Sequence, residues 1–122
     1  MIEDGKPIFV QVAERIEDDI VAGTLPDGGQ APSTNEIAAF YRINPATAGK
    51  GVNRLVDDGI LVKRRGIGMF VADGARERLL ARRRASFVAA FVAPLLTEAE
   101  SLGISPSEVA ALITDSRKDP TP

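Results

Sequence analysis

The spacing of apolar residues changes after Gly59, and the position of that change constrains the fold most strongly. Between residues 8 and 58, apolar side chains recur every three or four positions, as they do on one face of a helix. After Gly59 the pattern becomes two short apolar runs, 60–62 and 69–71, on either side of Lys63-Arg64-Arg65-Gly66-Ile67-Gly68. Two such runs around a glycine-containing tip predict a β-hairpin. The chain is therefore expected to fold as helices followed by a small hairpin.

Start and stop signals divide the helical part into three segments. The first, residues 8–22, carries isoleucine and valine in an i, i+4 series. Ser33 followed three positions later by Glu36 is the pattern of a capping box and predicts a second, short helix. Asn44-Pro45 combines an N-cap residue with a proline at the first helical position, which predicts a third helix. Helices and hairpin in this order predict a mainly α fold, a winged helix-turn-helix over residues 1–72, whose third helix can enter a DNA major groove.

A second region, residues 73–114, returns to helical spacing and is rich in apolar residues. Its apolar face is too wide for one exposed helix, so we expect helices that pack on the first domain or on a second copy, and we favour a homodimer. Pro94 is expected to kink this region, because proline removes the hydrogen bond to the Ala90 carbonyl. Residues 115–122 are expected to form a disordered tail. The residues assigned to the dimerisation face are Phe87, Val88, Phe91, Val92, Leu95, Leu96 and Leu102.

The composition argues against several classes of function. The 122 residues include no cysteine and no histidine, so a disulfide framework, the usual zinc ligands and the commonest acid–base catalyst are all missing. We therefore predict that the protein is not an enzyme and holds no metal and no cofactor.

Acidic Glu3 and Asp4 argue against a signal peptide and favour the cytoplasm. The longest nearly uncharged apolar stretch, residues 85–96, is too short to span a bilayer, so no membrane association is expected.

The net charge of −2 conceals an uneven distribution of charge. Residues 1–41 carry a net charge of −6, residues 42–84 carry +7 and residues 85–122 carry −3. A basic central block can set up a local positive potential that attracts a polyanion, although an ordinary solvated surface would give the same count. Six of the eleven basic residues lie in or next to the expected third helix and hairpin, which are the elements that contact DNA in a winged helix-turn-helix, and the other five lie between residues 76 and 84.

Several short motifs, taken together and in this order, resemble the GntR family of bacterial transcription regulators. The Asn-Pro-x-Thr opening of the third helix and the short helical tail are most similar to the YtrA subfamily of that family. The resemblance covers residues 7–71 by motif and 72–114 by size and pattern. The motifs are Pro7-Ile8-Phe9-Val10-Gln11-Val12, Gly23-Thr24-Leu25-Pro26, Pro32-Ser33-Thr34-Asn35-Glu36-Ile37-Ala38, Ile43-Asn44-Pro45-Ala46-Thr47 and Arg65-Gly66-Ile67-Gly68-Met69-Phe70-Val71.

The resemblance implies a homodimeric repressor that binds double-stranded operator DNA with pseudo-palindromic half-sites. It also leaves room for a small-molecule effector of unknown identity. Asn35 stands where most members have arginine, and Ala31 where leucine is usual, so the operator cannot be copied from relatives. The DNA-facing positions of the family fall on Ser33, Thr34, Asn35, Asn44, Pro45, Ala46, Thr47, Lys50, Arg65 and Gly66.

Several of these positions, and two glycines of the third helix, also have a structural explanation. Ser33 and Asn44 are helix N-caps, and capping alone would select them. Gly49 and Gly51 each lower helix stability by about 1 kcal/mol relative to alanine, which suggests that either DNA or another helix approaches them closely. A protein-interaction module with a winged-helix fold is the alternative function.

Overall fold

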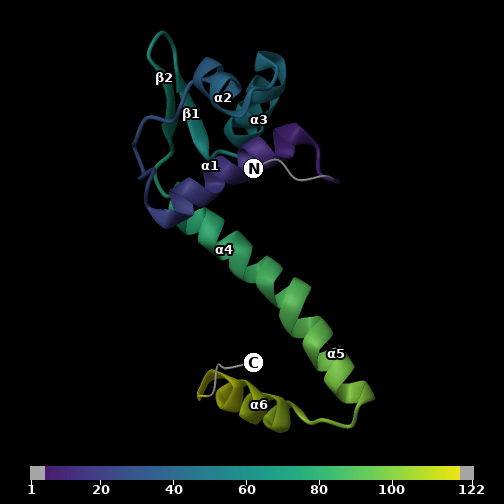
Figure 1. Ribbon diagram of the computed structural model, residues 1–122. Helices are drawn as coiled ribbons and strands as arrows, with labels where there is room; N and C mark the ends of the chain where they lie inside the picture. Colours follow the sequence, from purple (N-terminus) through teal and green to yellow (C-terminus); the bar gives the residue numbers. More distant parts are fainter. Residues whose placement is uncertain (1–4, 119–122) are drawn as a thin grey trace. The chain divides into compact units, whose positions relative to one another are not determined.

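The computed structural model (Figure 1) describes residues 5–118, the last two by their backbone alone. The chain divides into two compact units, Met1–Leu80 and Ala81–Pro122. The first unit contains α1 (Ile8–Ala22), α2 (Thr34–Tyr41), α3 (Pro45–Asp57), β1 (Leu61–Arg64) and β2 (Gly68–Val71). This order confirms the prediction of a winged helix-turn-helix. Helix α4 (Ala75–Phe87) begins in the first unit, and the chain continues with a π-helical segment η1 (Val88–Val92), α5 (Ala93–Ser101) and α6 (Pro106–Lys118).

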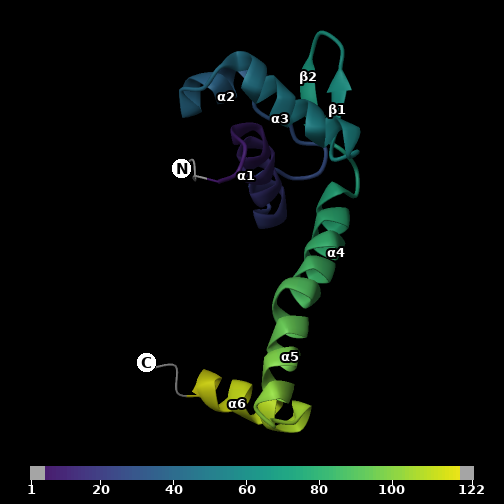
Figure 2. The ribbon, with the colours of Figure 1, turned by 90° about the vertical axis from the view of Figure 1, so that its right-hand side faces the viewer.

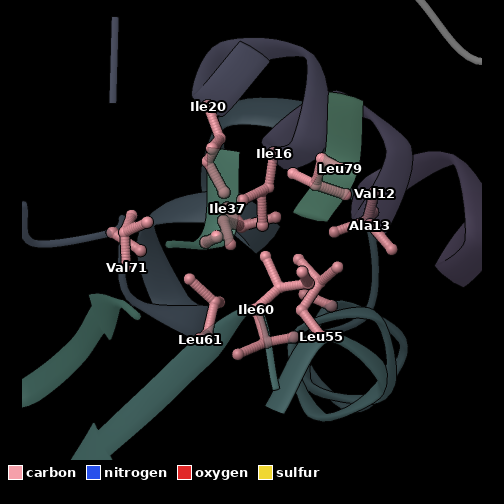
Figure 3. Close-up of a cluster of buried hydrophobic side chains, with 14 of the residues drawn as sticks. Val12, Ala13, Ile16, Ile20, Ile37, Leu55, Ile60, Leu61, Val71 and Leu79 are labelled. Carbon is pink, nitrogen blue, oxygen red and sulfur yellow. The ribbon is translucent and has the colours of Figure 1, made fainter. Parts of the chain in front are cut away.

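The core of the first unit is a single cluster of apolar side chains. Its largest fully buried members include Ile20 of α1, Leu55 of α3 and Leu61 of β1. Figure 3 shows that side chains from α1, α2, α3 and the hairpin gather in one place. The i, i+4 series of α1 supplies Val12, Ile16 and Ile20 to it, as the sequence predicts. No polar or charged residue among those described is buried, so apolar burial dominates this core.

The hairpin is a two-stranded antiparallel sheet extended by a third, irregular segment. The register pairs Leu61 with Val71 and Arg64 with Gly68. Residues 28–31 run beside β2: the N–H of Ala31 donates to the Met69 carbonyl at 2.8 Å, and Gln30 forms an isolated bridge with Phe70. These contacts hold the hairpin, which is the wing of the fold, against the segment that leads into α2.

The first turns of α4 are part of the first unit. Ala75 and Leu79 are fully buried in the same apolar cluster. The Asp27 carboxylate accepts a hydrogen bond from the N–H of Gly74 at 2.8 Å, and the Arg78 guanidinium donates to the Gly59 carbonyl at 2.6 Å. The core therefore extends beyond residue 72, where the sequence-based prediction ends the first domain.

The second unit has a local irregularity next to Pro94. The helix is expected to kink there, and the structure has a π-helical turn, η1, in which the N–H of Ala93 donates to the Val88 carbonyl. A wider turn accommodates the proline ring, which would otherwise clash with the carbonyl four residues earlier. Helix α6 includes residues 115–118, where a disordered tail is expected, and residues 119–122 of that tail lie outside the described part of the chain.

Within residues 5–118, no single helix is long and apolar enough to cross a membrane. One bent pair, Ala75–Ser101 with Pro106–Ser116, satisfies the test by length and composition only.

Candidate nucleic-acid interface

The start of α2 is fixed by a reciprocal cap. The Ser33 hydroxyl accepts a hydrogen bond from the N–H of Glu36 at 3.1 Å, and the Glu36 carboxylate accepts one from the N–H of Ser33 at 2.9 Å. Hydrogen bonds from the backbone and side chain of Ser33 lower the pKa of Glu36 below its usual value. The cap predicted from the sequence is thus present. Ser33 and Asn35 are exposed in this first turn, and Thr34 is half-buried.

The start of α3 is fixed by Asn44. Its side-chain oxygen accepts a hydrogen bond from the N–H of Ala46 at 2.8 Å, and Pro45 occupies the first helical position. Arg42 ends α2 in the left-handed conformation, with φ of 55°, which turns the chain sharply into α3. Asn44, Pro45 and Ala46 are exposed, whereas Thr47 is half-buried.

Helix α3 has a residue without a side chain, Gly51, where it crosses α1. A Cβ atom at Gly51 would lie 2.8 Å from the Phe9 carbonyl oxygen and 2.9 Å from Cγ1 of Val12. A close helix crossing therefore explains this glycine. A Cβ atom at Gly49 would meet only Cγ2 of Thr34, at an ordinary 3.6 Å, so the folded chain has no steric need for glycine there.

The outer face of α3 carries an open groove with a volume of about 770 Å³. The Nζ atom of Lys50 lies 4.1 Å from the centroid of the Phe9 ring, so a cation–π contact holds this exposed lysine at the groove. Phe9 and Asn53 were not predicted in this role, although Asn53 follows Lys50 by one helical turn. The groove is lined by Phe9, Ala46, Gly49, Lys50, Asn53, Arg54, Asp57 and Asp58.

The wing presents its basic residues in different directions. The Arg64 guanidinium lies 4.7 Å from the centroid of the Phe70 ring, on the face opposite Lys63. Arg65 and Gly66 form the exposed tip, where Gly66 has a φ of 76°. A residue with a side chain rarely adopts this conformation, and the lack of a side chain at Gly66 leaves the tip backbone accessible.

A second groove joins the start of α2 to the wing. Its volume is about 530 Å³, and Ser33 and Glu36 lie on one side of it, with Ile67 and Gly68 on the other. In both Figure 1 and Figure 2, α2 and the hairpin tip lie on the side of the first unit away from α1, whereas α3 packs against both α1 and α2. Three of the predicted residues line these grooves: Ser33 borders the wing groove, and Ala46 and Lys50 border the α3 groove. The other seven line neither groove: Thr34, Asn35, Asn44, Pro45, Thr47, Arg65 and Gly66.

The residues predicted for dimerisation are largely exposed in the second unit. Phe87, Phe91 and Leu102 are 56%, 65% and 64% exposed, respectively. The rings of Phe87 and Phe91 lie 5.7 Å apart, as expected for residues one turn apart. Leu112 and Ile113 of α6 are also exposed and were not assigned to this face. The remaining members are exposed Val88, Leu95 and Leu96 and half-buried Val92.

Three helices followed by a paired wing define a winged helix-turn-helix protein. The chain matches the model of a family described as bacterial regulatory proteins, gntR family, over residues 8–71, and it belongs to this family. Members of the family are DNA-binding regulators rather than enzymes, in agreement with the prediction from the sequence.

Two relatives illustrate the extent of the match. The "Probable fructoselysine utilization operon transcriptional repressor" of Escherichia coli is 34% identical over 73 residues, which are 60% of this chain and 30% of that protein. The repressor YtrA of Bacillus subtilis is 28% identical over 74 residues, 61% of this chain and 57% of YtrA. The chain thus spans about a third of the first relative and just over half of the second.

Solved structures extend the likeness to both units. A GntR-family structure from Bacteroides thetaiotaomicron has 30% identity and a TM-score of 0.76, and the match covers 93% of this chain and 99% of that one. The DNA-binding domain of AraR, solved in complex with its operator ORX1, has 30% identity and a TM-score of 0.54 over 59% of this chain and 87% of that one.

Proposed function

We propose that this protein is a transcriptional repressor that binds a pseudo-palindromic operator as a homodimer. The observation that carries the proposal is that residues 8–71 match the gntR family and fold as its helices and wing, with exposed residues at the start of α3 and at the wing tip. The same kind of domain in AraR was solved in complex with an operator. We place the protein in the cytoplasm, because its target is chromosomal DNA.

In this proposal, α3 supplies the contacts that read the operator sequence. Residues in the first turn of a recognition helix reach base edges in the major groove, and the exposed residues there are Asn44, Pro45 and Ala46, followed by half-buried Thr47. Lys50 extends from the next turn toward a phosphate, supported by the Phe9 ring. We assign the residues at the start of α2, Ser33, Thr34 and Asn35, to contacts with the neighbouring phosphates of the DNA backbone.

The wing supplies contacts that do not depend on sequence. Arg65 carries a charge that suits a phosphate, and Gly66 allows the DNA backbone to approach the tip closely. Contacts of this kind position the protein on the duplex and make its affinity depend on salt.

The exposed apolar face of the second unit is the proposed dimer interface. Large exposed apolar patches are uncommon in monomers and mark interaction sites. A two-fold dimer requires two half-sites, one helical turn or a multiple of it apart. Repression then follows from occlusion of the promoter, and an unidentified small molecule can relieve it by binding the DNA-competent and released dimer geometries with different affinities.

A gel-shift titration on DNA from upstream of the gene tests the proposal directly. Thr47→Ala is expected to weaken operator binding about tenfold, as loss of a base contact does, while leaving binding to scrambled DNA unchanged. Arg65→Ala should weaken binding to both duplexes and lower the slope of log affinity against log salt by about 1.

Arg15→Ala is the matched control, because Arg15 is exposed on α1 and lines neither groove. It removes the same charge, and it should leave the affinity for the operator near that of the wild type. If Arg15→Ala and Arg65→Ala weaken binding equally, the effect is one of net charge and the assigned surface is wrong. If no upstream duplex competes better than scrambled DNA, the proposal fails and the protein-interaction module becomes the better interpretation.

A further inference from the structure

We propose that Gln30 is a positioning residue of the wing: its side-chain amide holds the wing tip in the conformation that presents Arg65 and Gly66. Its effect on DNA binding rests on the proposed function, whereas its contact with the wing stands on the structure alone.

The contact joins two segments that lie far apart in the sequence. The Nε2 atom of Gln30 donates a hydrogen bond to the Ile67 carbonyl at 3.1 Å. Ile67 closes the tip, because its own N–H donates to the Arg64 carbonyl at 3.0 Å. The amide of Gln30 thus fastens the last residue of the tip turn to the segment in front of α2.

The wing is shaped to receive this amide. A Cβ atom at Gly68 would lie 2.7 Å from Nε2 of Gln30, so any larger residue at position 68 would displace the amide. Gly68 also has a φ of 139°, which residues with side chains rarely adopt. The backbone bridge between Gln30 and Phe70 places Gln30 at the same level of the wing. Three observations therefore place the Gln30 side chain against the base of the tip.

The contact matters for binding rather than for folding. Gln30 is exposed and makes no part of the buried cluster, so the core does not depend on its side chain. A tip that is already ordered in the free protein loses less conformational freedom on meeting DNA, and this raises affinity. The Gln30 amide acts on DNA binding through Arg65 and Gly66. Its contribution to the affinity for DNA should therefore disappear when Arg65 is absent.

A double-mutant cycle measures this dependence. Gln30→Met keeps the length of the side chain and removes the donor, and it is expected to weaken operator binding about threefold to tenfold, the range of one net hydrogen bond. In the Arg65→Ala background, Gln30→Met should cause no further loss. Gln11→Met is the matched control, because Gln11 also donates an amide hydrogen to a backbone carbonyl, that of Lys6 at 2.9 Å in the first unit, away from the wing.

Hydrogen exchange in the free protein tests the contact without DNA. Gln30→Met should accelerate exchange of the backbone amides of residues 66–68 and leave those of α1 unchanged. Unchanged exchange at the tip would overturn the proposal, as would additive losses of Gln30→Met and Arg65→Ala, which would mean that Gln30 contacts DNA by itself. If the wild type binds no operator, the proposed function fails, and the exchange measurement still decides whether Gln30 holds the tip.

Discussion

Two glycines in α3 differ in the reason for their presence. Gly51 lies where α3 crosses α1, and a side chain there would collide with the Phe9 carbonyl. Gly49 faces the α3 groove, and a methyl group there would meet only Thr34 at an ordinary distance. The sequence could identify both as unfavourable in a helix, but it could not separate a helix crossing from an approach by DNA.

Substitution by alanine should therefore have opposite effects on stability at the two positions. Gly51→Ala should lower the free energy of unfolding by about 1–3 kcal/mol, because overpacking outweighs the gain in helix propensity. Gly49→Ala should raise it by up to about 1 kcal/mol, because the new methyl group fits. Urea denaturation of the two variants measures both changes. A Gly51→Ala protein as stable as the wild type would show that α1 and α3 can separate at their crossing at no cost.

Local residue roles could be predicted from the sequence, and roles set by tertiary packing could not. The caps at Ser33 and Asn44 depend on residues within three positions, so the local sequence pattern is sufficient to predict them. The support of Lys50 by Phe9 depends on where α1 crosses α3, and no spacing along the chain contains that information. The DNA contacts assigned to these residues remain predictions.

At the scale of elements, α2 is a short helix whose N-terminal cap includes the carboxylate of Glu36. Glu36 accepts a hydrogen bond from Ser33 at the N-terminus of the helix, where negative charge is also favoured by the helix dipole. Its pKa is lowered in the folded protein, so its contribution to stability is present above its ordinary pKa and is lost as the pH falls through the lowered value.

Glu36→Gln should therefore reduce the acid sensitivity of the fold. A glutamine can accept the same hydrogen bond but does not titrate, so the loss of unfolding free energy between pH 7 and pH 3 should be smaller in this variant than in the wild type. Urea denaturation at the two pH values provides the comparison. Glu100→Gln, which removes one negative charge from α5, is the control. Equal acid sensitivity of the wild type and Glu36→Gln would contradict the assignment.

The elements themselves were predictable where the periodicity was clear. The helices of the first unit and the hairpin follow from spacing, caps and the change of pattern at Gly59. The π-helical turn before Pro94 was not predictable, because the sequence shows that a normal hydrogen bond is missing but not how the backbone adjusts.

At the scale of the whole molecule, the boundary of the DNA-binding unit falls inside α4. The domain predicted from the sequence ends at residue 72, after the last strand residue. Ala75 and Leu79 are nevertheless fully buried in its core, and their spacing merges with the helical pattern that follows. The sequence alone could not indicate which of two cores these two residues join.

A truncation at residue 80 should fold and one at residue 72 should be strongly destabilised. The shorter form loses Leu79, and loss of a buried leucine side chain alone costs about 2–5 kcal/mol. Thermal unfolding monitored by circular dichroism compares the two. The 1–80 form should also be monomeric by light scattering, because it lacks the proposed dimer face. A dimeric 1–80 protein would move the interface to the first unit.

The two-sided construction of α3 also bears on how such a protein could change its target over generations. Ala48, Gly51, Val52 and Leu55 are committed to the scaffold, and Ala46, Lys50 and Asn53 are exposed on the opposite side. Substitutions on the outer side carry little risk of unfolding the chain, since surface changes usually alter stability by less than about 0.5 kcal/mol. A duplicated gene could therefore acquire a new operator one base at a time while inheriting an unchanged scaffold.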